Sequence, residues 1–251
     1  MFANYHTHTT RCRHAMGDDR AYIEAAIESG VKILGFSDHA TFPDHGCVGM
    51  QPQELQEYMS TFRSLREEFK SRVQIHIGLE LEYSPKEFVR QLDFLRQHGV
   101  EYLILGQHFL FGMDYPAGIH TPCFDARYLD YHCGLQREAM DTGVISYIAH
   151  PDIFNFAGSK EEYDRHIRPM CRHARDLNIP LEINLLGLRT NRHYPREHFW
   201  QIAGEEGCPV VLGCDAHEPE AFHDKSAPLA AMTLVDKYQL NLQQTVTLRQ
   251  V

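Results

Sequence analysis

The sequence predicts a closed or nearly closed α/β barrel, on three observations. Seven short apolar runs rich in β-branched or aromatic residues recur along the 251 residues, as in strands buried on both faces. Amphipathic helical patterns lie between these runs, which indicates parallel strands joined by helical crossovers. No linker or shift in composition separates two parts, so residues 1–251 are expected to form a single domain. An open, doubly wound sheet is the alternative architecture.

The predicted strands are short, and comparable strand ends follow one another at intervals of roughly 28 to 42 residues. The first helical segment places Tyr22 and Ala26 on one stripe, and Gly30 and Gly99 suit helix ends. Prolines near other helix starts, such as Pro52, fit the first helical turn. Strands are expected at 2–8, 32–39, 73–83, 102–109, 144–150, 180–187 and 209–217, and helices at 18–30, 52–69, 85–99, 126–143, 161–178 and 196–207.

The composition excludes several function classes. A net charge of −10 argues against a general nucleic-acid or anionic-membrane surface. No apolar run approaches the roughly 20 residues that span a bilayer, and no secretory signal is recognisable. We therefore expect a cytoplasmic protein with no nucleic-acid and no membrane partner, and the sequence specifies no oligomeric state. The seven cysteines are odd in number and form no CxxC motif, which favours reduced thiols.

Six of the seven predicted strands end on a histidine or a carboxylate. Because the carboxyl ends of all strands in an α/β barrel converge on one face, these side chains are expected to meet there. His6 and His8 are two residues apart and point to the same side of a strand, and Asp215 and His217 repeat that spacing. His14 follows in a loop that can fold back over this face. The joint pattern predicts a metal site formed by His6, His8, His14, His39, Glu80, His108, His150, Asp215 and His217.

Nine candidate ligands are more than one metal ion requires. A metal with an open coordination position uses about three protein ligands, so the set predicts two or three divalent metal ions with a carboxylate as a bridge. Imidazole and carboxylate ligands suit zinc, manganese or iron, and the sequence does not choose among them. Cys12 lies between His8 and His14. Because the nine other ligands already satisfy the site, we expect Cys12 to be a packed or surface thiol.

A site of this kind favours the hydrolysis of a small phosphate monoester. Divalent metals lower the pKa of water to about 7 and stabilise charge on the attacking and leaving oxygens. Asp215 is the first candidate for general acid/base transfer, with His217 or His39 as substitutes, although a purely ligating Asp215 fits equally well. Arg189 and Arg192 follow the sixth predicted strand. Since a guanidinium binds phosphate through two parallel hydrogen bonds, both are expected to bind the substrate phosphate.

The motifs that carry these residues follow a recognisable order along the chain. They are HTH, His14, SDH, GLE, the histidine of GQHF, AHP and DAH. This series, from His6 to His217, resembles the PHP (polymerase and histidinol phosphatase) family. The resemblance implies a distorted seven-stranded β/α barrel of the TIM-like, PHP type that holds up to three metal ions.

The resemblance also implies how the ligands are divided among the metals. The implied groups are His6 and His8 with Glu80 and Asp215; His14, His39 and His217; and His108 and His150 with Glu80 as a bridge. Glu82, on the same strand face as Glu80, is then an outer or barrel residue. The segments HTHTTRCRHAMG and LEINLLGLR resemble the monofunctional histidinol-phosphate phosphatases, which implies that Arg189 binds the substrate phosphate.

We therefore predict a phosphoric monoester hydrolase of histidine biosynthesis that converts L-histidinol phosphate to L-histidinol and phosphate. A nucleotide or another phosphorylated metabolite is the alternative substrate within the same chemistry. An amide or lactone hydrolase is disfavoured because such enzymes usually need a carboxylated lysine, and no lysine stands at a predicted strand end. The non-enzymatic alternative is a metal-binding regulatory module, which the full ligand set argues against.

Overall fold

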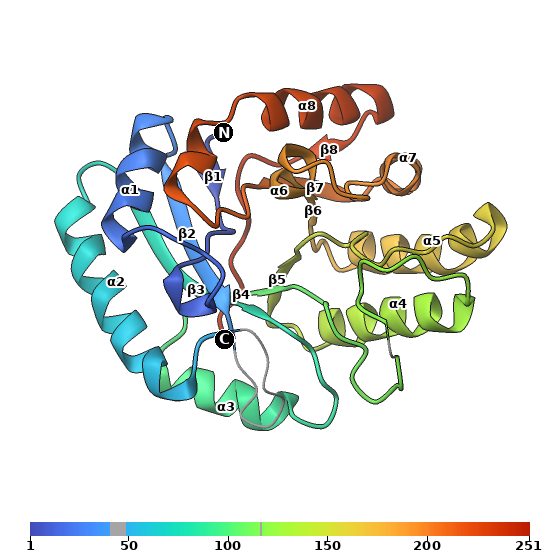
Figure 1. Ribbon diagram of the computed structural model, residues 1–251, viewed down its shortest axis with the longest axis horizontal. Coiled ribbons are helices and arrows are strands. Elements are labelled where there is room, and N and C mark those ends of the chain that lie inside the picture. Colours follow the sequence, from blue (N-terminus) through green and yellow to red (C-terminus); the bar gives the residue numbers. More distant parts are fainter. Residues whose placement is uncertain (41–48, 116) are drawn as a thin grey trace.

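The structure, a computed structural model, describes residues 1–40, 49–115 and 117–251. Its centre is a parallel sheet in which each strand lies beside the next strand in the chain. Helices surround this sheet in Figure 1. The strands are β1 (Ala3–Asn4), β2 (Ile33–His39), β3 (Gln74–Leu81), β4 (Leu103–Leu105), β5 (Ile145–Ile148), β6 (Leu181–Asn184), β7 (Pro209–Gly213) and β8 (Asn241–Leu242).

The sheet curls until the chain beyond β1 meets the chain beyond β7. A parallel β-bridge joins Thr7 to Ala216. The His8 amide donates to the Ala216 carbonyl at 2.9 Å, and the Ala216 amide donates to the His6 carbonyl at 3.3 Å. The predicted distorted β/α barrel is confirmed, with β8 as one strand more than the seven expected. The two-residue β8 pairs with the start of β7.

The helices agree with the prediction at six segments and exceed it at two. They are α1 (Asp19–Glu28), α2 (Leu55–Phe69), α3 (Phe88–His98), α4 (Ala126–Asp141), α5 (Lys160–Asp176), α6 (Leu185–Arg189), α7 (Glu197–Glu205) and α8 (Ser226–Tyr238), with short 3₁₀ turns at Thr10–Cys12, Pro52–Glu54 and Pro219–His223. Helices α6 and α8 were not predicted. The buried stripe of α8 consists of Ala227, Ala231 and Val235, which gives a weak apolar signal. Among the described residues, no helix is both long and apolar enough to cross a bilayer.

Several strands end earlier than the apolar runs suggested, because the backbone turns before the predicted ligands are reached. Strand β5 stops at Ile148, and β7 stops at Gly213. Beyond them, His150 has a φ of 29° and Asp215 a φ of 48°. Such left-handed conformations cost a non-glycine residue on the order of 1–3 kcal/mol and cluster at functional sites. The chain thus leaves regular strand geometry where the polar side chains begin.

An apolar cluster fills the barrel interior beneath these polar side chains. The buried Tyr102 hydroxyl donates to the Tyr5 carbonyl at 2.9 Å and to the Phe36 carbonyl at 3.0 Å. A Cβ atom at Gly35 would overlap that hydroxyl, so a glycine is needed there. The C-terminal segment returns to the centre of the ring in Figure 1 and adds the buried Val246 to this cluster. The filled interior leaves the carboxyl ends of the strands as the face that carries the polar residues.

Candidate metal centre

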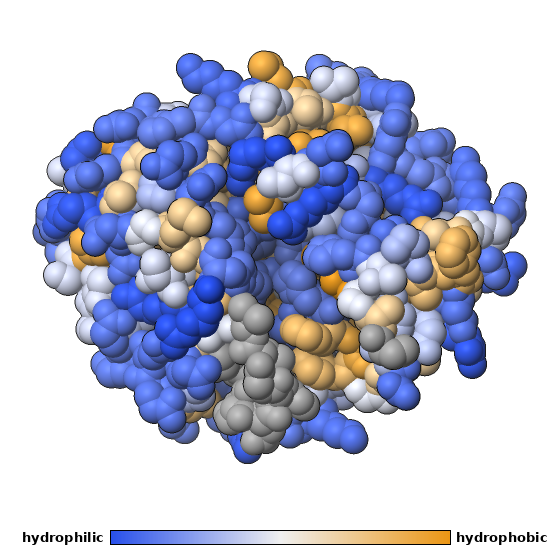
Figure 2. Space-filling view, in the orientation of Figure 1, coloured by the Kyte–Doolittle hydropathy of each residue, from blue (hydrophilic) through white to orange (hydrophobic). Residues whose placement is uncertain are grey.

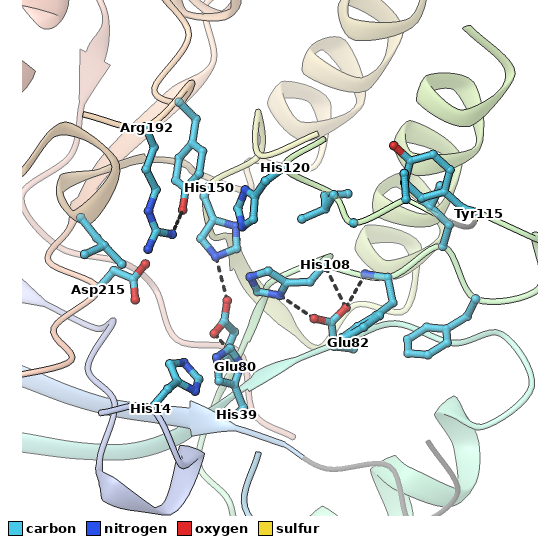
Figure 3. A pocket seen from close by; sticks show the side chains of 18 of the residues that line it. His14, His39, Glu80, Glu82, His108, Tyr115, His120, His150, Arg192 and Asp215 are labelled. Carbon is cyan, nitrogen blue, oxygen red and sulfur yellow. Dashed lines mark hydrogen bonds and ion pairs between the residues drawn. The ribbon is translucent and has the colours of Figure 1, made fainter. Parts of the chain in front are cut away.

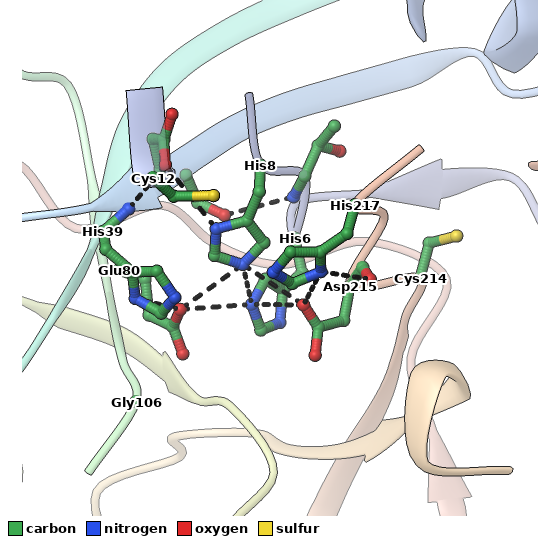
Figure 4. A network of polar contacts seen from close by, with 12 residues as sticks. His6, His8, Cys12, His39, Glu80, Gly106, Cys214, Asp215 and His217 are labelled. Carbon is green, nitrogen blue, oxygen red and sulfur yellow. Dashed lines mark hydrogen bonds and ion pairs between the residues drawn. The ribbon is translucent and has the colours of Figure 1, made fainter. Parts of the chain in front are cut away.

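Four buried side chains meet at the barrel mouth in Figure 4. The Nε2 atoms of His6 and His8 lie 3.1 Å apart. Asp215 Oδ1 lies 3.1 Å from His8 Nε2 and 3.4 Å from His6 Nε2. Glu80 Oε2 lies 3.4 Å from His8 Nε2 and 3.5 Å from His6 Nε2. The chain beyond β1 and the chain beyond β7, paired through the β-bridge, therefore bring ligand-type atoms from both ends of the sequence together with β3.

A second group of imidazoles lies on the outer side of His8. The ring centroids of His8 and His217 are 4.1 Å apart, and those of His14 and His217 are 4.7 Å apart. His39 Nδ1 lies 3.0 Å from Glu80 Oε2. The ligand-type nitrogens of His8, His39 and His217 all lie within 4.8 Å of one another. His14 Nδ1 donates to the Cys12 carbonyl at 2.8 Å, which leaves Nε2 for another contact.

His150 and His108 form the third group, on the other side of Glu80. His150 Nε2 lies 2.9 Å from Glu80 Oε1, and the His150 and His108 ring centroids are 4.7 Å apart. Glu80 therefore contacts His150 through one oxygen and His39 through the other, as Figure 3 shows. The structure brings all nine predicted ligands to one mouth. Glu80 contacts at least one histidine in each of the three groups.

The chemistry of this donor set fits divalent cations. Among the described residues, no well-aligned hydrogen bond reaches the buried oxygens Glu80 Oε2 and Asp215 Oδ1, although imidazole nitrogens lie 3.0 to 3.5 Å from each. A buried charge without compensation is costly, and a cation between these oxygens and the imidazoles would provide the compensation. Nitrogen and oxygen donors in this mixture suit zinc, manganese or iron. The residues present therefore fit the metal ions that the sequence predicted.

The pKa values of the carboxylates and imidazoles at the centre also indicate that the site requires positive charge. Burial favours the neutral form of Asp215, but the attraction of His6 and the contact with His8 outweigh burial and hold the pKa of its carboxyl well below the usual value. Burial also favours the neutral form of His6, yet Asp215 and Glu182 raise the pKa of its imidazole well above the usual value. In the absence of a cation, protons on the innermost imidazoles balance the carboxylates.

The outer imidazoles are held neutral. Burial lowers the pKa of His39 to about 4, and burial together with the neighbouring His8 lowers the pKa of His217 to about 2. At neutral pH both rings therefore carry a free lone pair. A neutral imidazole is the form that binds a metal ion.

Glu182, which the sequence analysis missed, orients two of the central residues, His6 and His150. Its Oε1 accepts a hydrogen bond from His6 Nδ1 at 2.8 Å, and its Oε2 accepts one from the His150 amide at 2.9 Å. The Asn184 side-chain amide donates to Glu182 Oε2 at 3.2 Å and to Asp215 Oδ2 at 3.0 Å. A carboxylate behind a histidine fixes the ring orientation and makes it a better ligand. The available signal was a glutamate inside the apolar run LEIN.

Glu82 acts on His108 in the same way, and Asp38 lies near His8 without hydrogen-bonding its ring. Glu82 Oε1 accepts from His108 Nδ1 at 2.5 Å, and Glu82 Oε2 accepts from the His108 amide at 2.8 Å. Asp38 accepts from the Thr9 amide at 3.2 Å, and its Oδ1 lies 3.7 Å from His8 Nδ1. The outer position expected for Glu82 agrees with this geometry. Asp38 was missed, although it too is a carboxylate within a buried strand.

A cavity of about 1050 Å³ opens over the metal-type residues. Figure 3 draws Arg192 and Asp215 at one end of the cavity and Tyr115 at the other, and Figure 2 shows the hollow from outside, with a hydrophobic area at its edge. The segments between β4 and α4 and between α6 and α7 provide most of the other lining residues. These include Phe109, Leu110, Phe111, Met113, Ile119, His120 and Tyr194. The sequence analysis missed them because irregular segments carry no periodic signal.

The two arginines predicted to bind phosphate lie in different places. Arg192 lines the cavity, and its Nη1 donates to the Tyr194 hydroxyl at 2.6 Å. Arg189 lines a separate cavity of about 440 Å³, donates to the Cys214 carbonyl at 3.3 Å, and has Nη1 3.9 Å from Asp224. Residues 180–187 were predicted as a continuous strand, whereas helix α6 begins directly after β6. That helix directs Arg189 away from the mouth.

The cysteines are free thiols wherever the structure describes them. Cys12 is fully buried, as expected for a packed thiol, and its sulfur lies within 4.8 Å of ligand-type nitrogens of His14 and His217. The described free cysteines are Cys12, Cys123, Cys133, Cys171, Cys208 and Cys214, and Cys47 lies outside the described residues.

Solved structures share this fold at low sequence identity. Histidinol phosphate phosphatase from Lactococcus lactis, in complex with zinc, L-histidinol and phosphate, has a TM-score of 0.76 and 18% identity over 98% of each chain. The metal-dependent tyrosine phosphatases YwqE from Bacillus subtilis and CpsB from Streptococcus pneumoniae have a TM-score of 0.54 and 14% identity, covering 99% of this chain and 98% of theirs. These likenesses support the barrel.

Sequence comparisons give the family. The probable histidinol-phosphatase of Deinococcus radiodurans is 31% identical over 232 residues, 85% of either chain. The histidinol-phosphatase of Bacillus subtilis is 26% identical over 250 residues, covering 85% of this chain and 92% of that relative. The PHP domain model matches residues 4–185. This chain belongs to the PHP domain family.

Proposed function

We propose that this chain is a metal-dependent phosphatase that hydrolyses L-histidinol phosphate to L-histidinol and phosphate. One observation carries the proposal: eight metal-type side chains surround Glu80 at the charged end of a cavity whose other end is largely apolar. Hydrolysis of a phosphate monoester is among the slowest uncatalysed reactions, so it needs a site with this density of charge. The names of the relatives support histidinol phosphate as the substrate.

We assign three metal positions to the three groups around Glu80. When bound, the metal ions would act as Lewis acids toward the phosphoryl oxygens. Zinc is the first candidate because the neighbouring Lactococcus structure contains it, and manganese and iron take the same donors. The proposed groups are His6, His8, Glu80 and Asp215; His14, His39 and His217; and His108 and His150 with Glu80.

We assign the substrate phosphate to Arg192 and no longer to Arg189. Arg192 lines the cavity that contains the metal-type residues. The Tyr194 hydroxyl fixes Nη1 of its guanidinium, which leaves the other two nitrogens for a phosphoryl group. Arg189 contacts the Cys214 carbonyl from a different cavity.

We assign protonation of the leaving alkoxide to Asp215. Three carboxylates are among the described lining residues, Glu80, Glu82 and Asp215. Glu80 lies between His39 and His150, and Glu82 accepts the His108 side chain. Asp215 Oδ2 accepts from the Asn184 side-chain amide at 3.0 Å, and its Oδ1 lies 3.1 Å from His8 Nε2 and 3.3 Å from His217 Nδ1. Because its pKa lies below the usual value, Asp215 would pass a proton on to the alkoxide and would not store one. His39 and His217 are the next candidates.

Phosphate release by the purified protein, loaded in turn with zinc and manganese, tests the proposal. The substrates are L-histidinol phosphate, a nucleoside monophosphate and a sugar phosphate at equal concentration. The proposal predicts the highest kcat/KM for L-histidinol phosphate. A higher value for another ester would assign the site to a different phosphorylated metabolite. No turnover of any ester by metal-loaded protein would favour the non-catalytic module.

A further inference from the structure

We propose that Asp152 is a positioning residue that holds the segment 190–196, and with it Arg192, in place over the metal centre. This proposal rests on the phosphate-binding role proposed for Arg192. Asp152 follows His150 by two residues, on the segment between β5 and α5, and is 3% exposed. It is not among the described residues that line the large cavity. Asp152 would therefore act through its neighbours and not by touching the substrate.

Three hydrogen bonds attach the 190–196 segment to residues 152–156. Asp152 Oδ2 accepts from the Arg196 amide at 2.5 Å. His193 Nε2 donates to the Ile153 carbonyl at 2.7 Å, and the Arg196 guanidinium donates to the Phe156 carbonyl at 2.5 Å. In the other two hydrogen bonds the acceptor is a backbone carbonyl of residues 152–156, whereas here it is the Asp152 side chain. A single substitution at Asp152 therefore removes this contact and leaves the other two acceptors in place.

Helix α6 holds the same segment from the opposite side. The Arg192 amide donates to the Gly187 carbonyl at 2.9 Å. A Cβ atom at Gly187 would overlap the Tyr194 carbonyl, so the two backbones are in close contact. Tyr194 is 1% exposed, and its hydroxyl accepts from Arg192 Nη1 at 2.6 Å. The segment is thus fixed between two neighbours, and Arg192 projects from it into the cavity.

The position of Asp152 links this segment to the metal centre. His150 is tied to the centre through its Nε2 contact with Glu80 Oε1 at 2.9 Å and through its amide, which donates to Glu182 Oε2 at 2.9 Å. Two residues later, Asp152 is tied to the segment that carries Arg192. One short stretch of chain therefore sets the distance between the proposed phosphate ligand and the proposed metal ligands. A misplacement of about 1 Å at a reacting site costs up to roughly 100-fold in rate.

The test compares Asp152→Ala with Asp152→Asn in metal-loaded enzyme, using L-histidinol phosphate as substrate and inorganic phosphate as inhibitor. We expect Asp152→Ala to raise both KM and the phosphate Ki by about 10- to 100-fold, with a smaller effect on kcat. The metal content should stay unchanged. Asp152→Asn retains an oxygen that accepts from the Arg196 amide, so it should restore KM to near the wild-type value.

A double-mutant cycle separates positioning from general destabilisation. Arg192→Gln alone should raise KM, and adding Asp152→Ala to it should raise KM little further, because both changes remove the same interaction. Unchanged KM in Asp152→Ala, or effects that multiply in the double variant, would overturn the proposal. A normal KM in Arg192→Gln would overturn the proposed phosphate role together with this inference.

A second variant covers the case in which Asp152→Ala does not fold. His193→Phe removes the donor to the Ile153 carbonyl and keeps an aromatic ring. It should raise KM and the phosphate Ki together, with the metal content unchanged. If KM and the phosphate Ki are unaltered in folded His193→Phe, the β5–α5 segment does not position Arg192 and the proposal fails.

Discussion

At the scale of single residues, the innermost imidazoles exchange protons for metal ions. The pKa of His6 is held well above its usual value because Asp215 and Glu182 outweigh the effect of burial, and His8 is shifted in the same direction. Their Nε2 atoms lie 3.1 Å apart and cannot both carry a proton, so one ring of this pair is protonated beyond the neutral form in the metal-free protein. Since a metal ion binds the neutral ring, binding must release this proton, and affinity must fall as the pH is lowered.

Zinc titrations of metal-free protein in two buffers with different ionisation enthalpies would count the protons released. We expect release of at least one proton at pH 7 and weaker binding at pH 6. Ligands that are already neutral would release no proton and would bind equally well at both pH values. Equal affinity at both pH values, with no protons released, would contradict the assigned charges. A protein with His6→Gln should release fewer protons than the wild type.

Arg192 and Arg189 allow a matched comparison of two substitutions, one inside the large cavity and one outside it. We expect Arg192→Gln to raise KM for the phosphate monoester by about 10-fold or more, because hydrogen bonds to a charged group contribute on the order of 1.5–3 kcal/mol. Arg189→Gln should leave KM near the wild-type value, since Arg189 lies in a separate cavity. Steady-state kinetics of both variants decide the assignment. The reverse pattern would return the phosphate role to Arg189.

At the scale of elements, glycines after the strands make room for the carboxylates. A Cβ atom at Gly106, directly after β4, would overlap the Glu80 carboxylate. We expect Gly106→Ala to displace Glu80 and reduce bound metal while the fold, measured by circular dichroism, is retained. Gly134→Ala, in α4 with open space around the added Cβ, is the control and should be neutral or stabilise by up to about 1 kcal/mol. Full metal content in Gly106→Ala would contradict the central position of Glu80.

The helices and strands also show how much of the fold and of the site could be predicted from the sequence. The regular alternation of apolar runs and amphipathic stripes predicted seven strands and six helices, and the strand ends predicted the cluster around Glu80, because both signals are local and periodic. Helix α6 was missed because LEINLLG reads as one apolar run, and this error misplaced Arg189. Glu182 and Asp38 were missed because their partners, His6 and Thr9, lie far away in the sequence.

At the scale of the whole molecule, the site closes the barrel. His8 and Ala216 are hydrogen-bonded across the junction of the first and seventh strands, and the neighbouring His6 and Asp215 point into the centre. A ligand that binds only the folded state at 1,000 times its Kd stabilises that state by about 4 kcal/mol. Bound metals should therefore stabilise the closed barrel against unfolding.

Chelation should accordingly lower the melting temperature, and added zinc should restore it. Differential scanning calorimetry with and without a chelator measures the shift. The variant Asp215→Asn, which weakens the ligand set at the junction, should show a smaller shift. Identical melting temperatures for metal-loaded and metal-free wild type would show that the junction is stable without metal ions.

Phosphate release from L-histidinol phosphate by the zinc- or manganese-loaded protein is the most direct test of the central claim. The proposed function predicts saturable turnover that disappears on chelation, returns with added metal, and exceeds the turnover of a nucleoside monophosphate. Metal-loaded, folded protein that releases no phosphate from L-histidinol phosphate would contradict it.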